Sequence, residues 1–150
     1  MVGGSDEWRG LLISILFISI IAFFVLPHMS RMNTTSGLHR FFTIGLILKL
    51  VFSLFLIWIG IVIYGGLVDW VGYHNTGTQI SQYIGQFEFD KLIPYMKWGT
   101  TSVDLFTGVI YSITGPSLYG GFLIFACIAF IGSYLFLRAF IIVFPQENVR

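Results

Sequence analysis

Residues 50–68 read LVFSLFLIWIGIVIYGGLV, a stretch of 19 residues that contains no charged side chain. A helix of this length and composition can cross the hydrocarbon core of a membrane. The apolar run extends upstream to Phe41 and is interrupted only by Lys49, whose long side chain can reach the headgroups when the preceding turns lie at the interface. The stretch therefore predicts a transmembrane helix over 50–68.

Two further apolar runs complete this pattern. One covers residues 11–27 and ends at Pro27, and the other covers residues 118–144 with Arg138 as its single charge. The chain is 56% hydrophobic and 10% charged, whereas soluble domains carry about 25% charged residues. We therefore expect one all-α membrane domain over 1–150, with about three transmembrane helices. For the first run a cleaved signal peptide is the alternative, disfavoured by the mixed charges before it and the lack of a small-residue cleavage site.

The basic residues indicate the orientation of the chain, because cytoplasmic loops carry an excess of Lys and Arg. The link before the second run contains Arg31 and Arg40 and no acidic residue, whereas the polar segment 69–117 contains four carboxylates and two lysines. We expect a multi-pass protein of the plasma (inner) membrane, with the link and the C-terminus inside and segment 69–117 outside. Lys49 and Arg138 then act as interfacial anchors, and a role in transport or catalysis is the alternative.

Composition excludes several function classes. The eight Lys and Arg residues are scattered singly, so no nucleic-acid-binding surface is expected. Cys127 is the single cysteine and lies in an apolar run, which excludes a disulfide framework and a cysteine metal site. The sequence contains no phosphate-binding glycine loop, no nucleophile elbow and no zinc-protease motif. Nearly all of the candidate catalytic and binding side chains lie in segment 69–117.

Segment 69–117 carries the signal of a short amphipathic helix between Thr76 and Phe87. Apolar residues recur there at helical spacing, and the opposite face is polar. We expect this helix to lie flat in the membrane interface, with its apolar face toward lipid or the neighbouring spans. The apolar face consists of Ile80, Tyr83, Ile84 and Phe87, and the polar face of Gln79, Gln82 and Gln86.

A second short helix is expected over residues 103–113. Thr101-x-x-Asp104 is a capping pattern that can satisfy the first N–H groups of a helix, and Gly115-Pro116 ends the apolar stretch. Because 11 residues are too few to span a bilayer, we expect an interfacial or re-entrant helix. Its apolar face contains Val103, Phe106, Thr107 and Ile110.

Asp69 carries the clearest functional signal in the segment. It directly follows an apolar run, and Tyr73, His74 and Asn75 come shortly after it. A carboxylate at the membrane border costs free energy unless it meets water, a cation or a hydrogen-bond donor, and lipid headgroups lie at this depth. The alternative is that Asp69 only marks the end of the span beside an interfacial tryptophan, and that His74 orients a turn.

The same residues belong to a longer pattern. An Asp-x-x-x-Tyr-His-Asn sequence starts at Asp69, and a Gly-Thr-Thr element at 99–101 and an Ile-Thr-Gly-Pro turn at 113–116 follow it. Over about residues 40–145 the chain resembles the N-terminal portion of bacterial polytopic membrane glycosyltransferases of the C-type superfamily. These are mannosyltransferase-like enzymes of the cell envelope that use polyprenyl-phosphate-linked sugars.

The resemblance implies a role for each of the candidate residues. Asp69 would be the catalytic base that deprotonates an acceptor hydroxyl while the sugar leaves the lipid phosphate. Tyr73, His74, Asn75 and Lys97 would bind substrate, and Lys97 or His74 would supply positive charge near the phosphate. No cofactor is certain, and a divalent cation is the alternative source of that charge. Because the family members have more spans, further transmembrane segments or another subunit would complete the donor site.

Two other function classes remain open. The chain could be a small non-catalytic membrane subunit that assembles with a larger partner or with itself, through small residues such as Gly60, Gly121 and Ala126. A channel or transporter subunit is disfavoured, because the middle of each run lacks charge. An enzyme requires segment 69–117 to fold around a pocket, whereas an assembly subunit requires only the spans.

Overall fold

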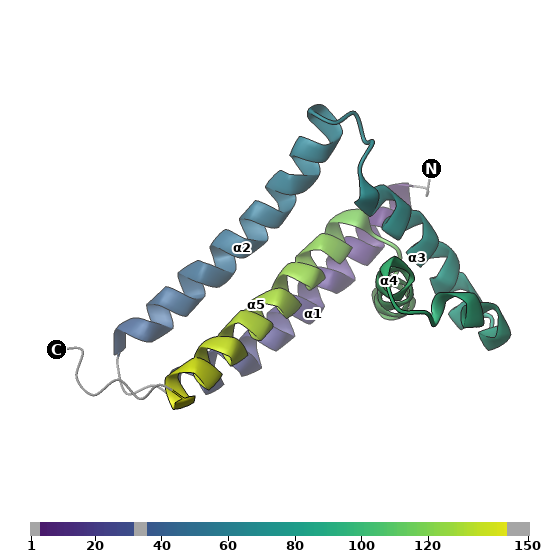
Figure 1. Cartoon of the computed structure of the whole chain (residues 1–150). Helices are drawn as coiled ribbons and strands as arrows, with labels where there is room; N and C mark the ends of the chain where they lie inside the picture. Colours follow the sequence, from purple (N-terminus) through teal and green to yellow (C-terminus); the bar gives the residue numbers. More distant parts are fainter. Residues whose placement is uncertain (1–3, 32–35, 144–150) are drawn as a thin grey trace.

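The part of the chain that the structure describes folds into helices. The computed structural model describes residues 4–31 and 36–143, and these ranges contain six helices and no strand (Figure 1). The expected all-α class is therefore confirmed. The side chains of Arg31 and Arg138, and the predicted end of the third span at residue 144, lie outside the described residues. In chain order the helices are α1 (Gly4–Arg31), α2 (Ser36–Val62), α3 (Asp69–Gly85), the 3₁₀ helix η1 (Phe89–Tyr95), α4 (Thr100–Thr114) and α5 (Leu118–Val143).

Two of the described helices are long and apolar enough to cross a membrane, Arg40–Val62 in α2 and Leu118–Leu137 in α5. The sequence predicts three such spans. The range 11–27 is helical as part of α1. Among the described residues, however, α1 does not contain a stretch that is long and apolar enough to count as a candidate span. Lys49 lies inside the apolar stretch of α2, so this stretch begins earlier than the predicted start at residue 50.

α2 ends at Val62, although the apolar run continues to Val68. Gly65 and Gly66 follow with φ angles of 59° and 79°, which glycine adopts without steric strain. The N–H of Gly66 donates a hydrogen bond of 2.9 Å to the carbonyl of Gly60, a bond that satisfies a free carbonyl at the helix end. The predicted helix over 50–68 is therefore wrong beyond Val62, because two glycines turn the chain where hydropathy alone would continue it.

The three long helices form a bundle in which α1 and α5 run in the same direction and α2 runs opposite to them (Figure 1). Small residues let α1 and α5 approach closely where both begin. A Cβ on Gly10 would lie only 2.7 Å from the Cβ of Ser117, and a Cβ on Gly120 would overlap Ser14. Two clusters of buried residues hold the helices together. One joins α1 and α5 to α4 and consists of Ile18, Ile110, Tyr111, Leu123, Ile124 and Cys127. The other joins α2 to α5 and consists of Phe42, Leu46, Phe130 and Tyr134.

α3 and α4 pack on each other and form a layer at the end of the bundle where α5 begins, with α3 running across the bundle axis (Figure 1). Two glycines permit this contact. A Cβ on Gly77 would lie 2.6 Å from the methyl group of Thr107, and a Cβ on Gly108 would overlap Ile80, which is fully buried. Ile80 therefore contacts α4, and its predicted contact with lipid or the spans is wrong.

The amphipathic pattern of α3 is correct in part. The helix begins at Asp69 rather than at the predicted Thr76, and it ends at Gly85. Phe87, predicted as the last member of the apolar face, lies beyond this end with a φ of 60° and is 80% exposed. Phe87 is therefore not part of the helix, and only its predicted place on the helical face is wrong. The three glutamines predicted to face water, Gln79, Gln82 and Gln86, are exposed.

α4 contains the helix predicted over 103–113, but its first turn is not capped by the predicted side chains. Its N-cap is Gly99, with a φ of 119° and no side-chain capping bond. The hydroxyl of Thr101 donates instead to the carbonyl of Lys97 at 3.0 Å, so the predicted cap of Thr101 and Asp104 is wrong. Asp104 is half-buried, and this burial raises the pKa of its carboxyl. Within the predicted apolar face, Thr107 and Ile110 are buried, whereas Val103 and Phe106 are exposed.

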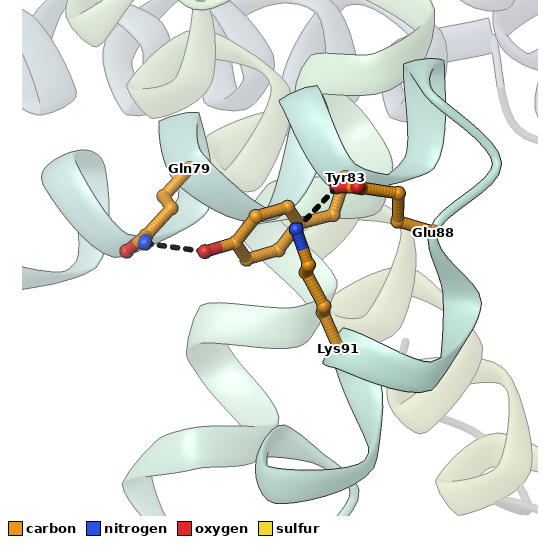
Figure 2. A network of polar contacts seen from close by, with 4 residues as sticks. All are labelled: Gln79, Tyr83, Glu88 and Lys91. Carbon is orange, nitrogen blue, oxygen red and sulfur yellow. Dashed lines mark hydrogen bonds and ion pairs between the residues drawn. The ribbon is translucent and has the colours of Figure 1, made fainter.

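A polar network on the surface joins η1 to α3 (Figure 2). The ammonium of Lys91 lies 2.8 Å from a carboxylate oxygen of Glu88 and 5.1 Å from the centroid of the Tyr83 ring. The side-chain amide of Gln79 donates a hydrogen bond of 2.6 Å to the hydroxyl of Tyr83. Because these groups are exposed, water and salt weaken the contacts. The network therefore orients η1 and adds little to the stability of the fold.

Candidate functional site

A pocket of about 200 Å³ lies between α3, α4 and the first turns of α5. Trp70 and Phe122 meet edge to face in its wall, with 5.6 Å between their ring centroids. Most of the lining is aromatic or aliphatic, which suits an apolar or aromatic group held by a few polar contacts. The lining residues are Trp70, Tyr73, His74, Val103, Thr107, Tyr111, Leu118, Gly121, Phe122 and Phe125.

His74 and Tyr111 form the polar centre of the pocket. The Nδ1 atom of His74 and the hydroxyl oxygen of Tyr111 are 2.9 Å apart, which joins α3 to α4. Tyr111 is 4% exposed, and Gly121 of α5 leaves room for its hydroxyl, since a Cβ there would lie 2.8 Å from that oxygen. The hydroxyl of Thr78 donates to the carbonyl of His74 at 2.8 Å. Three helices thus determine where this pair lies.

Burial controls the protonation of the pair. It lowers the pKa of His74, although the charge of Glu7 acts in the opposite direction, and it raises the pKa of the Tyr111 hydroxyl. Both groups are therefore neutral near pH 7. Either Tyr111 donates its proton to Nδ1 and the ring proton is on Nε2, or Nδ1–H donates to the tyrosine oxygen. A neutral His74 can donate and accept hydrogen bonds and can exchange a proton.

Asp69 lies outside the lining of the pocket. It occupies the first turn of α3 and is exposed, and the N-cap before it makes no side-chain bond. A carboxylate at this position interacts favourably with the N-terminal end of the helix dipole. Tyr73, which lines the pocket, follows one helical turn later on the same face. Asn75, also predicted to bind substrate, is exposed and does not line the pocket.

Lys97 belongs to a different surface. It lines a second groove, of about 350 Å³, where η1 ends and α4 begins. The structure therefore brings Tyr73 and His74 together in one pocket and separates them from Lys97. Lys97 does not contribute its charge to the lining that contains His74.

Two residues of this region are missed by sequence reasoning, Tyr111 and Glu7. Tyr111 belongs to no recognised motif, and the only signal in the sequence is its place one helical turn after Thr107, a member of the expected apolar face. Glu7 of α1 accepts hydrogen bonds from the hydroxyl of Ser117, at 3.0 Å, and from the N–H of Leu118, at 3.3 Å. No local pattern indicates that contact, because 110 residues separate Glu7 from Ser117.

The site contains little that would bind a metal ion. Among residues 4–31 and 36–143, no group of three or more His, Cys, Asp or Glu side chains is arranged to hold one. Cys127 is a free cysteine buried in the bundle.

No family profile, no curated protein and no solved structure matches this chain.

Proposed function

We propose that this chain is part of a membrane glycosyltransferase that transfers a sugar from a polyprenyl-phosphate donor to an acceptor on the outer face of the membrane. The observation that carries the proposal is the packed helical layer of segment 69–117, whose α3 and α4 meet α5 around an aromatic pocket centred on His74 and Tyr111. A subunit that only assembles through its spans has no need of such a layer. The resemblance of the sequence from Asp69 to Asn75 to C-type enzymes supports the same activity.

Asp69 is the proposed catalytic base. The acceptor hydroxyl gives its proton to the Asp69 carboxylate, and the acceptor oxygen forms a bond to the anomeric carbon of the sugar. The bond between that carbon and the phosphate oxygen breaks, and the lipid phosphate leaves. The exposure of Asp69, one helical turn before Tyr73, supports this role because an acceptor can reach the carboxylate from water. His74 and Tyr111 orient substrate hydroxyls through hydrogen bonds.

The donor site requires positive charge from another part of the assembly. The pocket lining contains no Lys or Arg, whereas a leaving phosphate is stabilised by cations. Further transmembrane segments or a partner subunit supply this charge in the proposal. The exposed aromatic side of α2 supports such an assembly, since Phe52, Phe55 and Trp58 are exposed there and the rings of Phe55 and Trp58 stack with 5.6 Å between centroids. The same side of α2 favours the second candidate function, a non-catalytic assembly subunit.

The test is Asp69→Asn, with Asp90→Asn as the matched control on η1. Transfer from a labelled polyprenyl-phosphate sugar is measured in membranes that contain the complete, active assembly, with equal amounts of each variant. We expect Asp69→Asn to lower the rate by about 10²–10⁴-fold, the usual contribution of a general base, and Asp90→Asn to leave it unchanged. Retained transfer in Asp69→Asn would remove this residue from the mechanism. Unchanged transfer after deletion of the whole chain would overturn the enzyme proposal itself.

A further inference from the structure

α4 has a second apolar side in addition to the one that contacts α3. Its inner side is occupied, because Gly108 lies against Ile80 and Tyr111 is buried at the pocket. Phe106, Val109 and Ile113 follow one another at spacings of three and four residues, which places them on one face of the helix. They are 46%, 42% and 67% exposed. An exposed apolar stripe of this kind marks a surface that interacts with protein or with a membrane.

This apolar side continues into the turn before α4. Met96 is exposed and Trp98 is completely exposed, and both line the groove of about 350 Å³ together with Phe106 and Val109. Lys97 lies in the same groove. We call this surface the outer face of α4. It consists of Phe106, Val109 and Ile113 of the helix and of Met96 and Trp98 in the turn before it.

The composition of the outer face of α4 is that of a membrane border. Tryptophan combines a large apolar ring with a polar N–H and is enriched at the headgroup level. Lysine places its charge in the headgroups while its carbon chain stays on apolar surface. The other side of the helical layer is different, because Gln79 and Gln82 of α3 are exposed there. The layer therefore has a polar surface on α3 and an apolar surface on α4.

The connections to the two long helices restrict where the layer can lie. Residues 63–68 join α2 to α3, and residues 115–117 join α4 to α5. Since an extended residue covers at most about 3.6 Å, these short links hold the layer close to the C-terminal end of α2 and to the N-terminal end of α5. In Figure 1 α4 is seen end-on beside the first turns of α5. If α2 and α5 span a bilayer, α4 is therefore held at its border.

We propose that the outer face of α4 docks on the membrane, in the leaflet where α5 begins, with Trp98 and Phe106 at the level of the upper acyl chains. Helices with one apolar side and a basic residue at the polar edge bind lipid surfaces in this orientation. α4 is then the interfacial helix of this chain, and α3 lies above it in water. The proposal does not depend on the glycosyltransferase activity and remains testable if that activity is absent.

The test measures the environment of Trp98 in nanodiscs of phosphatidylcholine and phosphatidylglycerol that contain the whole chain. The difference in tryptophan emission between the wild type and Trp98→Phe isolates the signal of Trp98. We expect this signal to be shifted to shorter wavelength, and to be mostly lost when the lipids carry bromine near the headgroup end of their acyl chains. Iodide in the buffer should have little effect on it.

A tryptophan on the opposite side of the layer provides the matched control. Gln82→Trp in the Trp98→Phe background places the probe on the exposed surface of α3, where iodide should quench it and brominated lipid should not. Quenching of Trp98 by iodide and not by brominated lipid would overturn the proposal, because the outer face would then lie in water. Protection of Trp98 from both quenchers would also overturn it, because protein, such as a second copy of the chain, would then cover this face.

Discussion

The hydroxyl of Ser117 donates a hydrogen bond of 3.0 Å to the carboxylate of Glu7, and this bond joins residues 110 positions apart in the sequence. The oxygen of Ser117 also accepts a bond of 3.0 Å from the N–H of Gly120, so Ser117 caps the first turn of α5. The Glu7 carboxylate lies at the same helix N-terminus, where a negative charge is favourable. This contact attaches the beginning of α1 to the helix that forms one wall of the pocket.

We predict that Glu7→Gln destabilises the fold by about 0.5–2 kcal/mol, because it removes the charge that interacts with the N-terminus of α5. Unfolding followed by circular dichroism in mild detergent gives this free energy. Asp90→Asn is the control, since Asp90 is an exposed carboxylate on η1, and its change should stay within about 0.5 kcal/mol. Equal effects of the two substitutions would show that the contact of Glu7 with α5 adds no stability.

Gly108→Ala should destabilise the chain by about 1–3 kcal/mol, the usual cost of overpacking a filled contact. The added methyl would overlap Ile80 and force α3 away from α4. Gly72→Ala is the matched control on α3, because nothing lies within 4 Å of the Cβ position there, and an alanine in an exposed helix is neutral or slightly stabilising. A stable Gly108→Ala variant would mean that α3 and α4 do not cross this closely.

The stability of the chain should decrease as the pH falls below 6.5, the ordinary pKa of His74. In the unfolded chain His74 binds a proton near this pH, whereas burial lowers its pKa in the folded chain, so folded His74 binds the proton only at lower pH. Between the two values the unfolded state holds more protons and is favoured by acid. Stability measured between pH 5 and 8 tests this. His74→Gln should reduce the pH dependence, and an identical dependence in both chains would contradict the prediction.

The orientation of the chain can be tested with cysteines at two positions. Thr35→Cys lies in the link with Arg31 and Arg40 and should resist a membrane-impermeant thiol reagent in intact cells, because basic residues near span ends stay in the cytoplasm. Gln82→Cys on the exposed surface of α3 should react. The unsubstituted chain is the control, since its Cys127 is buried. Labelling at position 35 with protection at position 82 would reverse the proposed topology.

The sequence alone predicts the helical class and the approximate positions of the helices other than η1, for which no pattern in the sequence gives a signal. Long apolar runs predicted the helices over 11–27 and 118–144, and the three-to-four-residue spacing around Ile80 predicted a helix with its glutamines in water. These features are local, because hydropathy and helical periodicity depend only on neighbours in the chain. Tyr73 and His74 were also identified as candidate residues from their place after the second run.

The tertiary structure decided which surfaces these helices use. The spacing that predicts a buried side for Ile80 does not say whether lipid, a span or α4 covers it, and the answer depends on the absence of a side chain at Gly77 and Gly108. The bond between His74 and Tyr111 joins residues 37 positions apart, and that between Glu7 and Ser117 joins residues 110 apart. Contacts over such separations leave no periodic trace in the sequence, because they exist only after the helices have packed.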